Sequence, residues 1–317
     1  MTDVSDLDVR ALTELTPAEA AEVRAIASAA TATDGVAPLS EHGLLSLSGG
    51  EGGVRHYLGY AAGGVRGYAQ ADRAGEGASV EIVVDPAHRQ AGLGDALWRV
   101  VDRSHPGARV WAHGDLPAAR AFAEREGMVQ VRELHKMARP LGPQDLEAAA
   151  TALPPGFTAR AFRPGEDDTA WVETNAAAFS DHPEQGQMAL ADLRERMAQP
   201  WFDPEGFIVV EADDAPGRVA AFHWTKVEVD HSPGAEPARP HGEVYVVGVH
   251  PAYQGRGLAR PLTALGLAHL AGRGLPEVVL YVDGDNTAAM KTYTGLGFRS
   301  IMVDVMYSGA VDPPVSG

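Results

Sequence analysis

The chain has 317 residues, 45% of them hydrophobic, which favours two globular domains and excludes a largely disordered protein. Its net charge of −17 is unfavourable for binding a nucleic-acid backbone or an anionic membrane surface. The chain has no cysteine, which excludes disulfides, thiolate nucleophiles and cysteine-ligated zinc.

No apolar run is long enough to cross a membrane, and the first ten residues lack the apolar core of a signal peptide. We therefore expect a cytoplasmic monomer without a nucleic-acid or membrane partner. The histidines show no tight metal-binding spacing, so we also predict no metal.

The first half of the chain predicts strands interspersed with helices. Apolar periodicity and turn residues set their limits. The expected elements are a helix over 17–30, strands over 55–61, 65–71 and 79–84, a helix over 93–104, a strand over 109–113, a helix over 117–126 and a strand pair after Gly127.

The second half predicts a similar order. The expected elements are strands over 206–211, 218–229 and 243–249, a helix from about 257, a strand over 277–282, a helix over 287–295 and a strand over 298–307. Because helices alternate with strands while some strands follow each other directly, the pattern is typical of a mixed α/β domain used twice.

The two halves repeat each other. Pro86 and Gly92 precede Pro251 and Gly257 by the same offset of 165 residues, and Ala118 precedes Ala288 by 170. A period this long indicates two homologous domains with a five-residue insertion in one of them. Breaks rich in proline and glycine at 138–143 and 153–156 place the domains at about 1–145 and 155–317.

A glycine-containing loop, Gln254-Gly255-Arg256-Gly257-Leu258-Ala259, lies between an apolar strand and a helix. Free backbone N–H groups and the positive end of the helix dipole make such a corner an anion site. Arg256 and Arg260 add positive charge, and 89–94 occupy the same corner of the first half. The spacing matches neither a P-loop nor a dinucleotide-binding fingerprint.

These loops and the later segment 285–298 resemble the two halves of the GNAT N-acetyltransferase signature. The resemblance implies two tandem domains, each a central, mostly antiparallel sheet flanked by helices, with acetyl-CoA as co-substrate. The implied acetyl-CoA contacts are Val247, Gly248, Val249, Gln254, Gly255, Arg256, Gly257, Leu258, Ala259, Arg260, Asn286, Thr287, Ala288, Ala289, Met290 and Lys291 in the second domain, and Ile82, Val83, Val84, Gln90, Ala91, Gly92, Leu93, Gly94 and Asp95 in the first.

The tandem halves together with segments 33–41, 182–185 and 242–249 are more specifically similar to the mycothiol synthase family. The resemblance implies acetylation of the cysteinyl amine of a cysteine–glucosamine–inositol pseudo-disaccharide. It implies that this small molecule contacts Glu41, Glu184, Lys226, Glu243 and Tyr281.

Glu243 and Tyr293 are the candidate catalytic residues. Glu243 can accept the amine proton, and Tyr293 can protonate the departing thiolate. A strand period of two puts Glu243, Tyr245 and Val247 on one face, and the resemblance implies a bulge there that turns the Val247 N–H toward the thioester.

The repeat offsets align Glu243 with Ala78 and Tyr293 with Ala123. We therefore expect the first domain to be non-catalytic, although its loop can hold acetyl-CoA. Two other functions stay open: acetylation of another amine, such as an aminoglycoside or a peptide N-terminus, and non-catalytic sensing of acyl-CoA. An insert at 228–240 is expected to be a surface loop.

Overall fold

The computed structural model describes residues 7–49, 53–72, 77–148, 153–180, 185–229 and 240–309. These residues form two compact units. The first unit contains 7–134 together with 302–309, and the second contains 135–229 and 240–301. The division into homologous domains at 1–145 and 155–317 stays a prediction. Most of the predicted surface insert, 230–239, lies outside the described residues.

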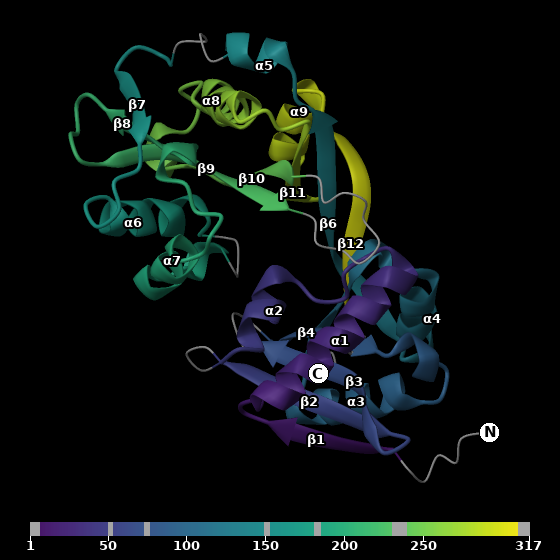
Figure 1. Cartoon of the computed structure of the whole chain (residues 1–317). Helices are drawn as coiled ribbons and strands as arrows, with labels where there is room; N and C mark the ends of the chain where they lie inside the picture. The colour runs from purple at the N-terminus through teal and green to yellow at the C-terminus, as the bar shows by residue number, and fades with distance from the viewer. Residues whose placement is uncertain are drawn as a thin grey trace, which may run out of the picture. The chain divides into compact units, whose positions relative to one another are not determined.

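The first unit has a mixed sheet with helices on both faces (Figure 1). Its elements are β1 (Asp8–Leu12), α1 (Pro17–Asp34), α2 (Glu41–Ser46), β2 (Val54–Ala61), β3 (Gly64–Asp72), β4 (Ser79–Val84), α3 (Leu93–Ser104), β5 (Arg109–Ala112), α4 (Pro117–Arg125), the first part of β6 (Met128–Pro140) and most of β12 (Arg299–Gly309).

The strands run in the order β1-β2-β3-β4-β5-β12. All neighbouring pairs are antiparallel except β4 and β5, which are parallel. The last strand of the chain thus pairs with β5, with Val305 opposite Ala112. The sheet of the first unit therefore includes residues from the far end of the sequence.

The predicted strand pair after Gly127 is wrong, because one strand, β6, runs over the whole of Met128–Pro140. No glycine, asparagine or aspartate interrupts 128–139, so nothing in this stretch favours a hairpin turn. The antiparallel partner of β5 is instead β12.

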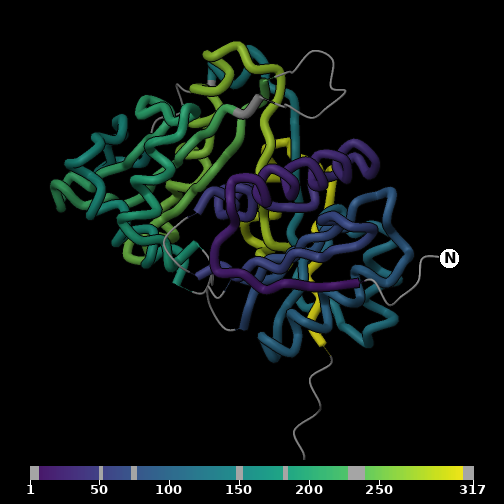
Figure 2. Tube along the Cα trace, turned by 60° about the horizontal axis from the view of Figure 1, so that its bottom comes forward, coloured from purple at the N-terminus to yellow at the C-terminus, as the bar shows by residue number. Residues whose placement is uncertain are grey.

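Alternate residues of the strands pack on opposite faces of this sheet. Tyr57 and Ala69 pack with Leu97 of α3, while Leu58 and Tyr68 pack with Val23 of α1. Figure 2 shows the purple helix α1 lying over the blue strands of this unit. Thr16 and Glu19 form a capping box at the start of α1.

The second unit repeats this plan. Its elements are the last part of β6, α5 (Pro143–Ala148), β7 (Phe157–Ala161), α6 (Asp168–Ala178), α7 (Leu190–Met197), β8 (Phe207–Ala212), β9 (Val219–Val229), β10 (Pro240–Val249), α8 (Ala259–Gly272), β11 (Glu277–Asp283) and α9 (Thr287–Gly295).

The strand order of the second unit is β6-β11-β10-β9-β8-β7, and β10 and β11 are a parallel pair. Trp171 of α6 and Leu193 of α7 pack on one group of strand residues, while Leu267 of α8 packs on another. The predicted mixed α/β fold, with a mostly antiparallel sheet in each half, is confirmed.

Candidate active site

The parallel strands β10 and β11 pair only over part of their length. Pairing joins Gly242–Val244 to Val278–Leu280, whereas β10 continues to Val249 and β11 to Asp283. The register between β9 and β10 also shifts between Val244 and Val246, so Tyr245 is the extra residue of a bulge. The bulge expected at this place is present. It lies where the two parallel strands stop pairing, and such a bulge can redirect backbone groups toward a ligand.

Glu243 lies just before the bulge and is buried. Its carboxylate is 4.0 Å from the ammonium of Lys226, its register partner on β9. Lys226 is only 3% exposed, and its Nζ lies 5.0 Å from the ring centre of Trp201 and 5.3 Å from that of Tyr245. A carboxylate, an ammonium and two aromatic faces therefore meet at one place.

Trp201 and Arg196 are site residues that no sequence motif indicates, and Tyr245 was predicted only to share a strand face with Glu243. The Nε of Arg196 donates a hydrogen bond to the Tyr245 hydroxyl at 3.0 Å. Arg196 and Trp201 come from the α7 region, more than 40 residues before Tyr245, and no motif links them to it. The bulge that the family resemblance implies in this strand indicates the place where these residues meet, but it does not identify Arg196 or Trp201.

The bulge also corrects one expectation. Tyr245 and Val246 both pack in the cluster around Trp224, whereas Val247 packs in the clusters of Leu267 and of Leu262. The prediction that Val247 shares the face of Glu243 is wrong, because an extra residue interrupts the period-two alternation. Its backbone N–H stays a candidate donor.

Tyr293 lies on α9, half-buried, with its ring centre 5.8 Å from that of Phe298. Burial raises the pKa of its phenol to about 12, so the hydroxyl keeps its proton at neutral pH. A group in this state can donate a proton or a hydrogen bond.

The other predicted substrate residues lie in different surroundings. Tyr281 on β11 is 43% exposed, with the Lys136 ammonium 5.6 Å from its ring centre. Glu41 is exposed at the start of α2, in the first unit. Glu184 lies outside the described residues.

The predicted phosphate loop of the second unit turns into α8 as expected. Gly255 and Gly257 have φ of +74° and +80°, which favour glycine, and the Gln254 side chain donates to Val249 O at 3.2 Å. Arg256 and Arg260 are exposed. The free N–H groups at the start of α8 and these two cations suit a pyrophosphate. At α9, Asn286 caps the helix by accepting from Ala289 N at 3.1 Å.

The first unit has the same corner. Gln90 and Gly92 have φ of +61° and +83°, and the Arg89 guanidinium donates to Val84 O at 3.2 Å, as Gln254 does in the second unit. Arg89 also forms two hydrogen bonds to Asp34, at 2.8 and 2.7 Å.

A cavity of about 720 Å³ opens beside this corner. It is lined by eight of the nine residues predicted to bind acetyl-CoA in this half, all except Ala91, and also by Trp111, His113 and Tyr307. Pairing of β4 with β5 ends at Val80 and Val110, so the cavity lies where these strands separate. Its volume and mostly apolar walls suit a pantetheine chain.

The registers refine the comparison of the two halves. The last parallel pair is Val80 with Val110 in the first unit and Val244 with Leu280 in the second, so Ser79, not Ala78, matches Glu243. The offset of 165 is wrong before the bulge, because Tyr245 has no counterpart in the continuous register of β3 and β4. Asp72, opposite Ser79, takes the place of Lys226.

Over the described ranges, no group of histidine, aspartate and glutamate side chains is arranged to hold a metal ion. Among the helices in the described part of the chain, none is both long and apolar enough to span a membrane.

Residues 171–298 match the acetyltransferase (GNAT) family. The chain is 50% identical over 307 residues to the mycothiol acetyltransferase of Thermomonospora curvata, covering 95% of this chain and 98% of that protein. It is 48% identical over 302 residues to that of Streptomyces bingchenggensis, covering 93% and 94%.

Solved structures show the same fold. A GCN5-related N-acetyltransferase from Sphaerobacter thermophilus matches with a TM-score of 0.66 and 25% identity, over 98% of this chain and 97% of that one. A tandem GNAT protein from the clavulanic acid biosynthesis pathway matches with a TM-score of 0.65 and 16% identity, over 97% of this chain and all of that one.

The structure has a bulged strand that separates from its parallel neighbour beside a glycine loop. Together with these matches, this arrangement defines a GNAT-class acetyltransferase. Enzymes of this class use acetyl-CoA. The predicted tandem GNAT architecture is confirmed. At 50% identity over nearly its whole length, the chain belongs to the mycothiol acetyltransferase family.

Proposed function

We propose that this chain transfers the acetyl group of acetyl-CoA to the cysteinyl amine of a cysteine–glucosamine–inositol pseudo-disaccharide, the last step in making mycothiol. The observation that carries the proposal is the buried Glu243–Lys226 pair beside the bulge of β10. The name shared by the relatives at 46–50% identity supports the choice of acceptor.

In this proposal Glu243 accepts the proton that the substrate ammonium must lose. The amine nitrogen then forms a bond to the thioester carbonyl carbon, and the bond from that carbon to sulfur breaks. The Val247 N–H donates a hydrogen bond to the carbonyl oxygen, and Tyr293 donates its proton to the leaving sulfur. The second proton that the nitrogen loses as the amide forms restores the Tyr293 hydroxyl, so the net proton released is the one that Glu243 accepted. We propose direct attack in a ternary complex, since the chain has no cysteine to carry the acetyl group, although a serine could in principle form an acyl-enzyme.

The donor is held by the glycine loop of the second unit, with Gly255 and Gly257 permitting close approach and Arg256 and Arg260 facing the phosphates. The start of α9 at Asn286 flanks the same donor. For the acceptor, we propose contacts with Glu41, Glu184, Lys226 and Tyr281.

We further propose that the first unit binds a second acetyl-CoA in its cavity without using it. Ser79 and Ala123 there stand in for Glu243 and Tyr293, and neither can transfer a proton at neutral pH. The protein would act as a cytoplasmic monomer on a small molecule alone, without a metal, nucleic acid or membrane.

The test is thiol release from acetyl-CoA by the purified protein with the desacetylated pseudo-disaccharide amine. Parallel reactions contain a panel of aminoglycosides and peptide N-termini. We expect fast release with the first amine only. Turnover on another amine alone would overturn the acceptor, and the absence of labelled acetyl transfer to every amine would favour an acyl-CoA sensor.

A further inference from the structure

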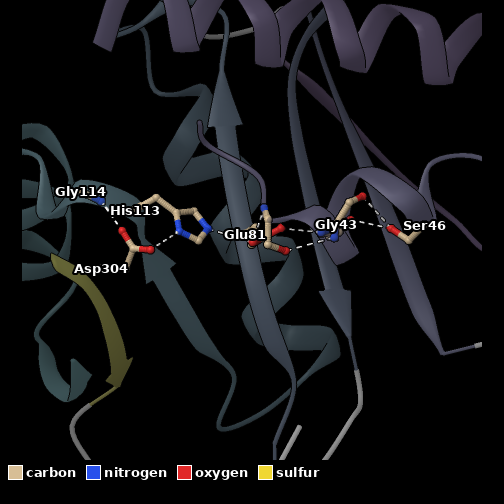
Figure 3. A network of polar contacts seen from close by, with 8 residues as sticks. Gly43, Ser46, Glu81, His113, Gly114 and Asp304 are labelled. Atoms are coloured by element: carbon tan, nitrogen blue, oxygen red, sulfur yellow. Dashed lines mark hydrogen bonds and ion pairs between the residues drawn. The ribbon is translucent and has the colours of Figure 1, made fainter. Parts of the chain in front are cut away.

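A buried chain of polar side chains runs through the first unit and is not used by the proposed chemistry. At its centre is Glu81 on β4, which is 5% exposed. Figure 3 shows Glu81 between His113 and Gly43. His113 Nε2 bonds Glu81 Oε1 at 2.8 Å, and Gln70 Nε2 donates to Glu81 Oε2 at 2.6 Å. Burying such groups is costly, so their arrangement needs a reason.

His113 is held by two carboxylates. Its Nδ1 lies 3.2 Å from Asp304, which also accepts from Gly114 N at 2.7 Å. Burial opposes the charge on the ring, but Asp304 and Glu81 outweigh it and raise the pKa of His113 to about 10. Burial likewise opposes ionisation of Glu81, yet His113 and the bonds from Ser40 lower its pKa. The ion pair therefore persists at neutral pH.

On the side away from His113, this network of polar side chains holds both ends of helix α2. Ser40 caps α2, accepting from Gly43 N at 3.1 Å, and its own backbone N–H donates to Glu81 at 2.9 Å. At the last residue of α2, Ser46 donates to Gln70 Oε1 at 3.0 Å. Gly43 lies so close to Gln70 and Glu81 that a Cβ there would overlap both side chains.

Six residues are too few to form a stable helix alone. The position of α2 must therefore come from its contacts, and the fixed acceptors on Glu81 and Gln70 supply a hydrogen bond at each end. Glu41, the first residue of α2, is one of the proposed acceptor contacts.

We propose that Glu81 and Gln70 are positioning residues for the acceptor, and that they act by fixing α2 and hence Glu41, with His113 and Asp304 holding Glu81 in place. The inference rests on the proposed function in one respect, namely that Glu41 contacts the acceptor. The placement of α2 by the network can be measured without any reaction.

The test variant is Glu81→Gln in the full chain. An amide at position 81 has one acceptor oxygen in place of two. If that oxygen accepts from Gln70, the new NH₂ group faces the Ser40 N–H, and the bond at the start of α2 is lost. If the oxygen accepts from Ser40, the new NH₂ group faces the NH₂ of Gln70. If Gln70 turns its oxygen to the new amide, it loses the bonds from Ser46 and Tyr68. Either way α2 loses an anchor.

The double exchange of Gln70→Glu with Glu81→Gln restores the pattern. The carboxylate introduced at position 70 can accept from Ser46, from Tyr68 and from the amide introduced at position 81. The oxygen of that amide can in turn accept from Ser40 N and His113. A matched control is Tyr57→Phe, which removes the 2.8 Å bond between the buried Tyr57 hydroxyl and His105 in the same unit, away from α2.

Two measurements are compared for each variant: hydrogen exchange of the α2 amides 43–46, and KM for acceptor and for acetyl-CoA. For Glu81→Gln we expect about tenfold faster α2 exchange and an acceptor KM about tenfold higher, because a charged hydrogen bond is lost. The KM for acetyl-CoA and kcat should stay within about twofold of wild type, as expected for lost ground-state binding. The double exchange should return both values toward wild type, and Tyr57→Phe should change neither.

Unchanged α2 exchange in Glu81→Gln, or equal hydrogen exchange in the double and the single variant, would overturn the positioning role. Gly43→Ala gives a second approach if Glu81→Gln does not fold, because the added Cβ overlaps the ends of the Gln70 and Glu81 side chains and so disturbs the contact between α2 and the network while keeping every charge. If wild type transfers no acetyl group to the amine, the proposed function fails, and the exchange measurements still decide whether the network places α2.

Discussion

Lys226 is a charge that the fold keeps away from water. An ammonium buried this deeply costs several kcal/mol unless other groups offset it. Trp201 and Tyr245 face it with their rings, and Glu243 supplies the opposite charge. The Lys226 ammonium in turn lies beside the carboxylate that the proposed reaction uses as its base. Charge balance and the proposed catalysis therefore depend on the same pair of residues.

Replacing Glu243 by Gln should separate these roles. The amide keeps the volume of the side chain but cannot accept the ammonium proton, so kcat should fall about 10²-fold or more. Thiol release at saturating acetyl-CoA measures the change. The matched control is Glu277→Gln, an exposed residue at the start of β11, which should keep wild-type rates. Near-normal turnover of Glu243→Gln would remove Glu243 from the mechanism.

His223 makes stability depend on pH. Burial lowers the pKa of this fully buried ring to about 4, and its Nδ1 lies 3.1 Å from Leu262 O. In the unfolded chain the same pKa is near 6.5, so between pH 6.5 and 4 the unfolded state binds more protons. The free energy of unfolding should therefore fall as the pH drops through this range, by up to about 3 kcal/mol.

Urea unfolding at pH 7 and pH 4.5 checks this expectation. His223→Gln should lose less stability over the interval than wild type, because it has no ring to protonate. His250→Gln, at a partly exposed turn, should follow wild type. Equal losses in all three proteins would contradict the assignment.

At the scale of single elements, α8 packs closely on β9, and the sequence pattern does not predict this contact. Gly266 in the middle of α8 lies against His223, and a Cβ there would overlap the imidazole ring. A glycine inside a helix is otherwise unfavourable by about 1 kcal/mol relative to alanine. Glycine is favoured at position 266 because the His223 ring occupies the space that a Cβ would need.

Gly266→Ala should accordingly destabilise the protein by about 1–3 kcal/mol despite its better helix propensity. Gly272→Ala, at the end of the same helix, is the control, since its Cβ would come only to 3.9 Å from Leu146. Thermal unfolding should show a lower midpoint for the first and an unchanged or higher one for the second. If Gly266→Ala were instead more stable than wild type, the His223 ring and α8 would have moved apart enough to accommodate the Cβ.

The elements that periodicity predicts well are the regular ones, and the site depends on the irregular ones. Helices α3 and α9 begin and end where the pattern places them. The bulge at Tyr245 could be inferred only by resemblance, because one extra residue leaves no mark on an apolar strand. Helix α2 was not predicted, since its six residues are held by distant side chains.

At the scale of the whole molecule, residues near the end of the sequence complete the sheet of the first unit. Residues 302–309 belong to the first unit, where β12 pairs with β5 and supplies Asp304 to His113. The repeat predicts two homologous halves, but it contains no signal for this return. Such a pairing depends on tertiary packing and not on local preference.

Removing every residue after Ile301 should therefore destabilise the first unit, although the shortened chain still contains all of residues 7–134. Loss of the β5 pairing leaves a strand edge uncovered, and loss of Asp304 removes one of the two carboxylates that hold the buried His113 ring. Hydrogen exchange in β4 and β5 should speed up at least tenfold. A chain that ends at Gly309 is the control, and full protection in the shorter chain would refute the expectation.

The pairing of β12 with β5 has a consequence during synthesis. The first 134 residues leave the ribosome early, but the strand that completes their sheet is made about 170 residues later. At 5–20 residues per second, this unit waits roughly 10–30 s for its last strand. During that time the edge of β5 is uncovered and open to other strands. The first unit is thus the first to be synthesised, but its sheet is the last to be completed.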